Sequence, residues 1–257
     1  MIRTITDNDL PMLKSMCGSD LFISRIVSSY NAYGKTGIAD FWVQTDDGLL
    51  NTVLSKIDGV LTISHVSRGN MDELSGFLYA VDAHTIVCSA DFPERVNLSA
   101  DRTGPILFCD NQTRRECDFE FVLNPPLKEI HGVMQKCRSS SFNPPPWEPF
   151  YLDMSHRTRH NLAISVGIRD EQGKLIGCGF TVSQTEQNAV LGGICVLPEL
   201  RNHGYGQKIV TALLSQLPQD RIYAFRAEGE YETFYRRLGF TESGEWAELD
   251  IRRHRLF

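Results

Sequence analysis

The sequence lacks several features that would assign it to whole classes of protein. Its 257 residues contain no run near the roughly 20 apolar residues of a membrane span. The opening residues "MIRTITDNDLPMLKSM" lack the apolar core of a signal peptide. Positive charge is not in excess, because 26 Lys and Arg residues face 32 Asp and Glu residues. The net charge of -6 argues against broad binding to nucleic acid or to an acidic membrane surface. These absences predict a cytoplasmic protein without membrane or nucleic-acid partners.

The cysteines also lack a pattern. There are seven of them, an odd number, scattered along the chain without a C-x-x-C pair. This spacing disfavours a metal site or a disulfide framework. We therefore expect no metal, and we expect reduced thiols that pack as small hydrophobic side chains, as is usual inside the cell.

What the sequence does contain is a pattern that occurs twice, in a chain long enough for two domains. In each half, strand-like runs with hairpin turns precede a helix and then a further strand. These elements cover residues 38–66, 71–81 and 84–90 in the first half, and 161–196, 203–217 and 221–227 in the second. We predict two similar halves in tandem, residues 1–117 and 118–257. The fold class is mixed α/β (α+β).

The stretch 192–217, "GGICVLPELRNHGYGQKIVTALLSQL", predicts a binding loop. Pro198 ends an apolar strand because it lacks a backbone N–H. The following Arg-x-x-Gly-x-Gly, Arg201–Gly206, falls at the start of a helix, where free N–H groups and the helix dipole favour negative charge. Gly204 and Gly206 have no Cβ, so a ligand can approach their amides. The chemistry that fits is pyrophosphate binding, and the alternative is a tight strand-to-helix turn without a ligand.

A second motif is "YETFYRRLGF", residues 231–240, which reads as a helix with Gly239 as its C-cap. Together, V-x-P-x-x-R-x-x-G-x-G at Val196–Gly206 and Y-R-R-L-G-F at Tyr235–Phe240 resemble the GNAT superfamily of acyl-CoA-dependent N-acyltransferases. The resemblance implies a largely antiparallel central sheet flanked by helices. Where the first half would carry its own loop it reads "SHVSRGNMDELSGF". The first half is therefore similar to a degenerate GNAT-like copy without a site for coenzyme A.

The resemblance implies transfer of an acetyl group from acetyl-CoA to an amine by direct attack on the thioester. The backbone of Cys195 and Val196 would pair with the pantetheine, and Tyr235 would protonate the departing thiolate. Cys195 as an acylated nucleophile is a rival interpretation, although packing is the favoured role for this thiol. The loop that would bind the pyrophosphate consists of Arg201, Asn202, His203, Gly204, Tyr205, Gly206 and Gln207.

The general base is less well marked. An amine with a pKa of about 10.4 must lose a proton before it attacks. Many family members carry an acid on the strand before the loop, but "AVLGGICVL" has none. Glu228 is nearest by count to a position that often holds asparagine in the family, so we name it as the candidate base. Glu230, His156, His160 and a chain of water molecules remain alternatives.

The acceptor is a small-molecule amine or a protein amine, and the sequence fixes neither it nor the oligomeric state. The basic cluster "HRTRH" (residues 156–160) could recognise an acceptor carboxylate or phosphate, although a solvated loop is the favoured interpretation. A second class of function is a CoA-binding regulatory or scaffolding module without transferase activity. A nucleotide-binding protein is a third, disfavoured because neither Walker A nor G-x-G-x-x-G occurs.

Overall fold

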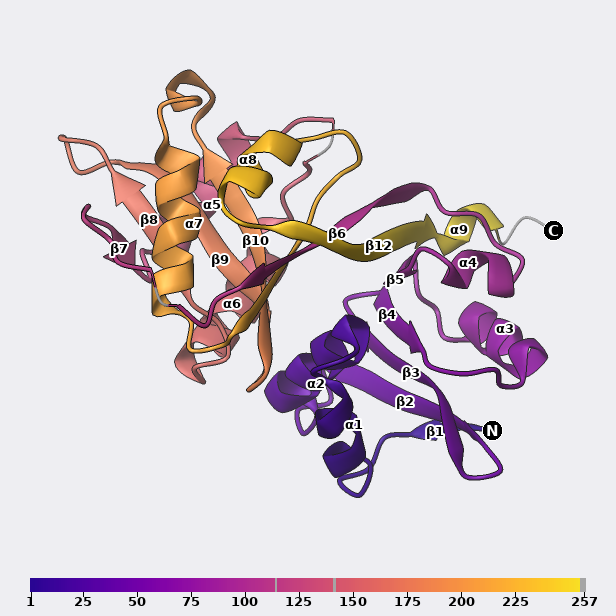
Figure 1. Cartoon of the computed structure of the whole chain (residues 1–257). Coiled ribbons are helices and arrows are strands. Elements are labelled where there is room, and N and C mark those ends of the chain that lie inside the picture. The colour runs from indigo at the N-terminus through magenta and orange to yellow at the C-terminus, as the bar shows by residue number, and fades with distance from the viewer. Residues whose placement is uncertain (114, 141, 255–257) are drawn as a thin grey trace. The chain divides into compact units, whose positions relative to one another are not determined.

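The protein is described here by a computed structural model that covers residues 1–113, 115–140 and 142–254 (Figure 1). The chain forms two compact units. Unit 1 contains Met1–Ile106 and the chain from Ser243 onward, and unit 2 contains Leu107–Glu242. Among the described residues, no helix is both long enough and apolar enough to cross a membrane.

Unit 1 is a mainly antiparallel sheet with the strand order β1-β2-β3-β4-β5-β12-β6, in which β4 and β5 run parallel. Its strands are β1 (Ile2–Thr4), β2 (Ala39–Asp46), β3 (Leu49–Ile57), β4 (Val60–His65), β5 (Thr85–Ser89), β6 (Arg102–Asp110) and β12 (Thr241–Asp250). Its helices are α1 (Leu10–Met16), α2 (Leu21–Tyr33), α3 (Met71–Ala80), α4 (Phe92–Arg95) and α9 (Ile251–His254).

The two predicted hairpins of unit 1 are confirmed. Asp47–Gly48 joins β2 to β3, and Asp58–Gly59 joins β3 to β4. All four residues have a positive φ, between 48° and 79°. Two successive residues with positive φ match the twist of the flanking strands, which is why Asp-Gly is such a strong hairpin signal.

Unit 2 has the strand order β12-β6-β11-β10-β9-β8-β7, to which β6 and β12 contribute the residues on the unit 2 side of the division. Its other strands are β7 (Val122–Leu123), β8 (Ser165–Arg169), β9 (Leu175–Gln184), β10 (Asn188–Val196) and β11 (Arg221–Phe225). Its helices are α5 (Leu127–Lys136), α6 (Trp147–Arg159), α7 (Tyr205–Gln216), α8 (Glu232–Arg237) and a 3-10 turn, η1 (Pro198–Leu200).

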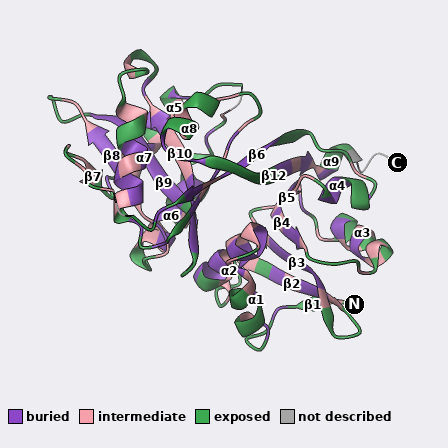
Figure 2. Ribbon diagram, in the orientation of Figure 1, coloured by how far each residue is buried: buried purple, intermediate pink, exposed green. Residues whose placement is uncertain are grey.

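Helices cover both faces of the unit 2 sheet, and β9 shows this by alternation. A Cβ at Gly177 or Gly179 would lie 2.8 Å from the side chain of Ile209 on α7. The thiol of Cys178, between those glycines, points to the other face, where it approaches the Ile130 carbonyl of α5. Successive residues of a strand face opposite sides, so the two glycines admit α7 and the cysteine packs under α5. β9, apart from Val182, and the inner side of α7 are buried (Figure 2).

The compact units differ from the predicted limits of 1–117 and 118–257. In unit 1, β12 pairs with β5 from Trp246↔Ser89 to Asp250↔Thr85, although β12 lies near the end of the predicted second half. In unit 2, β6 lies beside β11, and the Asn111 N–H just beyond it donates to the Asp220 carbonyl at 2.7 Å. Leu107–Cys117 therefore belongs to unit 2, and β12 largely to unit 1. Strand pairing over such sequence distances leaves no local signal.

Candidate active site

Strands β10 and β11 separate part of the way along β10. They pair in parallel only over Asn188–Leu191, whereas β10 continues beside β9 as far as Val196. Two irregularities in the β9–β10 register accompany the separation, and Gly193 within the second has a φ of 58°. The ring of Phe180 occupies the space where a Cβ at Gly193 would be, so no other residue fits there. Cys195 and Val196 lie beyond the last β10–β11 pair, on the separated part of the strand.

The loop after β10 turns its backbone sharply before α7 begins. Asn202 and Gly204 have positive φ angles of 65° and 82°, on either side of His203. Such turns present successive backbone N–H groups to one side and form a concave site for anions. Gly204 is the N-cap of α7, and no atom lies within 4 Å of the position its Cβ would take. The space over the start of α7 is therefore open at the amides that lack helical partners.

Gly206, the other glycine of the motif, has a different reason to be glycine. A Cβ there would lie 3.2 Å from the ring of Phe234 on α8. The absence of a side chain lets the first turn of α7 pack against α8. The motif thus combines one residue that opens space for a ligand with one that brings two helices together.

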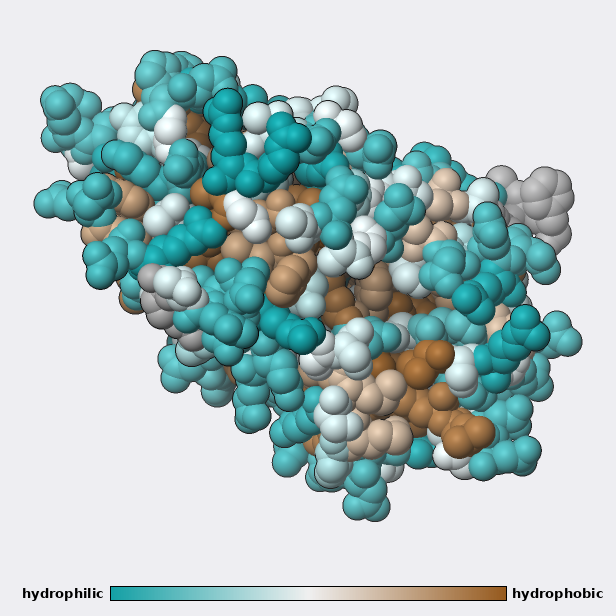
Figure 3. Space-filling model, viewed as in Figure 1, coloured by the Kyte–Doolittle hydropathy of each residue, from teal (hydrophilic) through white to brown (hydrophobic). Residues whose placement is uncertain are grey.

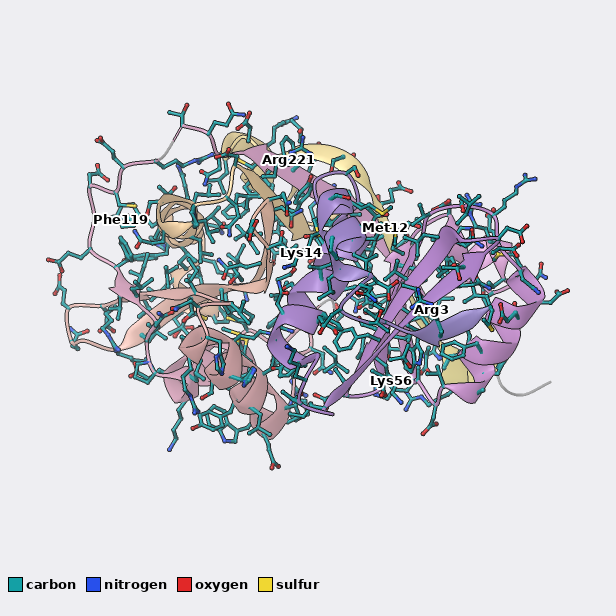
Figure 4. All side chains as sticks on the ribbon, turned by 90° about the horizontal axis from the view of Figure 1, so that it is seen from below. Arg3, Met12, Lys14, Lys56, Phe119 and Arg221 are labelled. Atoms are coloured by element: carbon teal, nitrogen blue, oxygen red, sulfur yellow. The ribbon has the colours of Figure 1, made fainter. Side chains whose placement is uncertain are left out.

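Side chains of the loop brace its entry. Arg201 donates from Nε to the Val196 carbonyl at 3.3 Å, and His203 Nδ1 lies 2.7 Å from the Arg201 carbonyl. Lys208, one turn into α7, lies with its Nζ 5.4 Å from the ring centroid of Phe119, which precedes β7 (Figure 4). Hydrophilic residues cover most of the visible surface of unit 2 (Figure 3). The loop therefore carries positive side chains beside the free amides.

Cys195 is a buried thiol in a group of three. A hydrogen bond with Cys137 lowers the pKa of Cys195, but a hydrogen bond with Cys178 and burial more than offset it and raise that pKa well above its ordinary value. The Cys137 thiol donates to the Val196 carbonyl at 3.2 Å. A protonated thiol is a poor nucleophile, which disfavours an acylated Cys195. All seven cysteines are reduced, and the described residues include no cluster of His, Cys, Asp and Glu that could bind a metal.

Tyr235, on α8, packs against the hydrophobic core that contains Cys195. Its ring makes edge contacts with Phe234 and Phe240, at centroid distances of 5.0 and 5.5 Å. Burial raises the pKa of Tyr235 to about 12, and Tyr231 and Cys195 add to the rise while Arg226 opposes it. Tyr235 therefore lies within electrostatic reach of Cys195 and carries a phenol that stays protonated in neutral solution.

The candidate bases are less well placed. Glu228 is exposed in the turn after β11 and, within the described residues, its side chain forms no hydrogen bond or ion pair. His156 and His160 lie at the end of α6 with their ring centroids 4.6 Å apart. Glu230 accepts a hydrogen bond through its backbone carbonyl, from Arg226.

The basic cluster at residues 156–160 and the aromatic residues of α6 have structural roles. The interpretation of 156–160 as a solvated loop was wrong, because α6 extends to Arg159 and Arg157 is buried against Asp153 at 2.7 Å. Phe150 is buried between His131 and Phe180, so this aromatic residue belongs to the core. Trp147 and Tyr151 are partly exposed and lie 5.1 Å apart between ring centroids.

Three polar residues of unit 2 were missed by the sequence reasoning: Asn111, Arg115 and Arg226. Asn111 is 1% exposed and its Nδ2 donates to three carbonyls around the end of α7. Arg115 and Arg226 hold the chain on either side of α8. Single polar residues carry no periodic or spacing signal, so nothing in the sequence could have singled them out.

In unit 1, the position that corresponds to the loop is closed by the protein itself. Asn70 caps α3 by accepting a hydrogen bond from the Glu73 N–H at 2.9 Å. Asp72 and Glu73 place two carboxylates in the first turn, where they favour the helix dipole and repel an anion. The Asn70 side chain thus occupies an amide that a phosphate group would need, while the Glu73 carboxylate accepts hydrogen bonds from the Ile2 N–H and from Gln44.

Comparison with known proteins agrees with this geometry. A Drosophila protein solved in a structural genomics programme has a TM-score of 0.69 at 15% identity, over 96% of this chain and 98% of its own. A tandem GNAT protein from the clavulanic acid biosynthesis pathway has a TM-score of 0.63 at 15% identity, over 96% and 97%. The uncharacterized N-acetyltransferase ycf52 of Pyropia yezoensis is 23% identical over 152 residues, 56% of this chain and 84% of that protein.

The fold defines the class as a mixed α/β chain of tandem GNAT architecture. Residues 163–242, within unit 2, match the acetyltransferase (GNAT) domain model. The match contains the loop before α7 and all of α8. This match and the likeness to an N-acetyltransferase support acyl-CoA-dependent N-acyltransferase activity in general terms.

Proposed function

We propose that the protein is an N-acetyltransferase that moves an acetyl group from acetyl-CoA to the amine of a small molecule or of a protein. The observation that carries the proposal is the meeting of three features at one end of unit 2. These are the separation of β10 from β11, the open amides before α7, and Tyr235 packed against the hydrophobic core that contains Cys195. Together these three features support a site that binds acetyl-CoA beside a proton donor.

The loop is the proposed site for the pyrophosphate, bound by the backbone amides of 201–207. The positive φ angles at Asn202 and Gly204, the open space at Gly204 and the dipole of α7 support this role. Arg201 adds positive charge next to the loop. The backbone at Cys195 and Val196 is the proposed partner of the pantetheine, because this part of β10 is not paired with β11. The Val196 carbonyl already accepts hydrogen bonds from Arg201 and Cys137, so a pantetheine there would share or replace these donors.

Direct attack is the proposed mechanism. The neutral acceptor amine attacks the thioester carbon, the C–S bond breaks, and the thiolate takes the phenolic proton of Tyr235. The proton that the nitrogen loses as it becomes an amide then restores the phenol. An ordinary thiol has a pKa of about 8.5, so a phenol whose pKa is raised to about 12 is fully protonated when the thiolate leaves. The protonated state of Cys195 supports this route over a covalent acyl-cysteine intermediate.

The proton of the acceptor ammonium goes to Glu228 in this proposal, directly or through water. The support is limited to position, because Glu228 lies in the turn between β11 and α8 and its carboxylate is exposed. A carboxylate in that turn would be near an acceptor that approaches the separated strands. Glu228→Gln should then lower kcat most at low pH, where free amine is scarce, and less at high pH.

The test of the function is a calorimetric titration with acetyl-CoA of the native protein, Gly204→Glu and Gly173→Glu. Gly173 is a matched control, because it also has a positive φ, 78°, and open space around its Cβ position, but lies in the β8–β9 turn. We expect binding by the native protein and by Gly173→Glu, and loss of binding in Gly204→Glu. Equal loss in both variants, or no binding by the folded native protein, contradicts the proposal.

An assay of acetyl-CoA turnover distinguishes an acetyltransferase from a protein that only binds coenzyme A. Release of free thiol from acetyl-CoA in the presence of amines, measured with a thiol reagent, is the expected result for a transferase. Tight binding without thiol release across amino acids, polyamines and peptide N-termini would instead indicate a CoA-binding regulatory module.

A further inference from the structure

The helix that carries Tyr235 has little to fix its position by itself. α8 spans six residues, Glu232–Arg237, and none of them is fully buried. Its N-cap, Tyr231, has a positive φ of 55° and provides no side-chain cap. Helices this short are only marginally stable in water, so tertiary contacts must hold α8. A proton donor on such a helix depends on those contacts.

The first contact is made by Arg226, at the end of β11. Its guanidinium donates from Nη1 to the Glu230 carbonyl at 2.9 Å, and from Nη2 to the Glu242 carboxylate at 2.8 Å. Glu230 directly precedes the N-cap of α8, and Glu242 follows the helix in β12. The side chain of Arg226 is only 6% exposed, so the fork is held rigidly. One residue thus ties the chain that enters α8 to the chain that leaves it.

The second contact is made by Arg115, from the segment after β6. Its Nη2 donates to the Leu238 carbonyl at 2.5 Å, at the C-cap of α8. The same nitrogen lies 3.5 Å from the Cys109 sulfur. A cation at the C-terminal end of a helix satisfies a free carbonyl and opposes the negative end of the dipole.

Tyr235 lies between these two contacts. Its own carbonyl accepts the N–H groups of Leu238 at 3.0 Å and Phe240 at 3.1 Å, so the residue that Arg115 holds is bonded to Tyr235. Its N–H donates to the Tyr231 carbonyl, one residue beyond the point that Arg226 holds. Displacement at either end of α8 would therefore move the phenol.

We propose that Arg115 and Arg226 form a clamp on the two ends of α8 and are positioning residues for Tyr235. The inference rests on the proposed role of Tyr235 as the proton donor. Arg115 comes from the segment before β7 that the sequence pattern assigned to the first half. The catalytic unit therefore depends on a residue outside the 163–242 match.

The first test follows Tyr235 without any acceptor. The protein is labelled with 3-fluorotyrosine, and the fluorine resonance of residue 235 is assigned by its loss in Tyr235→Phe. The variants are Arg115→Ala and Arg226→Lys, which keeps the charge but cannot bridge Glu230 and Glu242. The control is Arg237→Ala, which removes an equal charge from an exposed position on α8 itself. Thermal unfolding checks that each variant is folded.

We expect the Tyr235 resonance to shift or split in both clamp variants and to stay in place in Arg237→Ala. An unchanged resonance in folded Arg115→Ala and Arg226→Lys overturns the clamp. If Arg226→Lys does not fold, Arg115→Ala alone decides. This readout does not depend on catalysis, so it remains valid if the transferase function fails.

The second test is a double-mutant cycle with any amine that the native enzyme acetylates. A misplaced catalytic group can lose about 100-fold in rate, so we expect each clamp variant to lower kcat by about 10- to 100-fold. KM for acetyl-CoA should stay within about twofold, because the loop before α7 is untouched. In the Tyr235→Phe background the same substitutions should have almost no further effect. If the losses in kcat from the arginine and Tyr235 substitutions are additive, the arginines do not act through Tyr235, and their positioning role is overturned. If Tyr235→Phe by itself leaves kcat unchanged, the role of Tyr235 as proton donor is overturned, but the fluorine result still tests the clamp.

Discussion

Replacing Asn111 with alanine should destabilise unit 2 by about 2–4 kcal/mol. The Nδ2 atom of Asn111 donates to the carbonyls of Leu214, Leu217 and Gln219, at 3.1, 3.4 and 3.2 Å. These carbonyls lie in the last turn of α7 and in the turn to β11. The last carbonyls of a helix have no N–H partner within the helix. A net hydrogen bond contributes about 1 kcal/mol, and each buried group left without a partner costs about 1–3 kcal/mol. Asn111 has two N–H donors for three acceptors, so the estimate counts two bonds.

The assay is urea unfolding of the native protein, Asn111→Ala and Gln112→Ala, followed by fluorescence and circular dichroism. Gln112 is the next residue and is exposed, so its loss should change the free energy of unfolding by less than about 0.5 kcal/mol. The midpoint of the transition that acetyl-CoA stabilises should fall in Asn111→Ala with its slope unchanged. If Asn111→Ala unfolds at the same urea concentration as Gln112→Ala, the three hydrogen bonds do not stabilise the end of α7, and the reasoning is refuted.

Three further results are expected. Tyr235→Phe should lower kcat by about 100-fold or more, with little change in KM for acetyl-CoA. Because the pKa of Tyr235 is raised, ionisation of Tyr235 should not reduce kcat of the native enzyme at any pH up to the ordinary tyrosine pKa of 10.0. A kcat that already decreases at a pH well under 10 in the native enzyme, but not in Tyr235→Phe, contradicts this. The hydrogen bond from Arg3 lowers the pKa of Asp9, so this pair stabilises unit 1 above the ordinary carboxyl pKa of about 3.9 and the stabilisation is lost as the pH falls below it. Asp9→Asn should therefore unfold more easily at neutral pH and show a weaker loss of stability in acid, and parallel urea midpoints from pH 7 to pH 3 would refute the assignment. Calorimetry should give one acetyl-CoA per chain, because Asn70 and Glu73 close the start of α3 in unit 1; a stoichiometry of two would show that the closure opens.

Local chemistry made much of the fold predictable. The Asp-Gly turns at residues 47–48 and 58–59 need two positive φ angles in succession, and few other dipeptides provide them. The helix after Gly204 follows from the same kind of constraint, and so does the end of α8, where the C-cap is Leu238 and the next residue, Gly239, has a φ of 82°. The periodic apolar face of α7 is buried as its spacing required. Each of these features is decided by residues only a few positions apart.

The features that were missed depend on residues far apart in the sequence. Asn111, Arg115 and Arg226 are ordinary polar residues until packing brings carbonyl groups to them. Unit 2 begins at Leu107 within β6, and unit 1 takes most of β12. The predicted boundary at residue 117 therefore lies inside unit 2, where Cys117 contacts Ser215. The loop residues could be proposed as a site because they form a compact motif, whereas the long-range contacts around them have no motif. The roles of Glu228 and Tyr235 remain predictions of the family resemblance.

The position of β12 has a consequence for how the protein is made. Cys88 in β5 and Ala247 in β12 are neighbours across the sheet, yet they are 159 residues apart along the chain. During synthesis, β5 therefore leaves the ribosome long before its partner exists, and its edge is open to pairing with any other chain. A fragment ending near residue 117 would keep that exposed edge permanently and should aggregate, although it contains α1, α2, α3 and α4 of unit 1. Stable separation of the halves requires cutting and rejoining the chain so that β12 travels with β5.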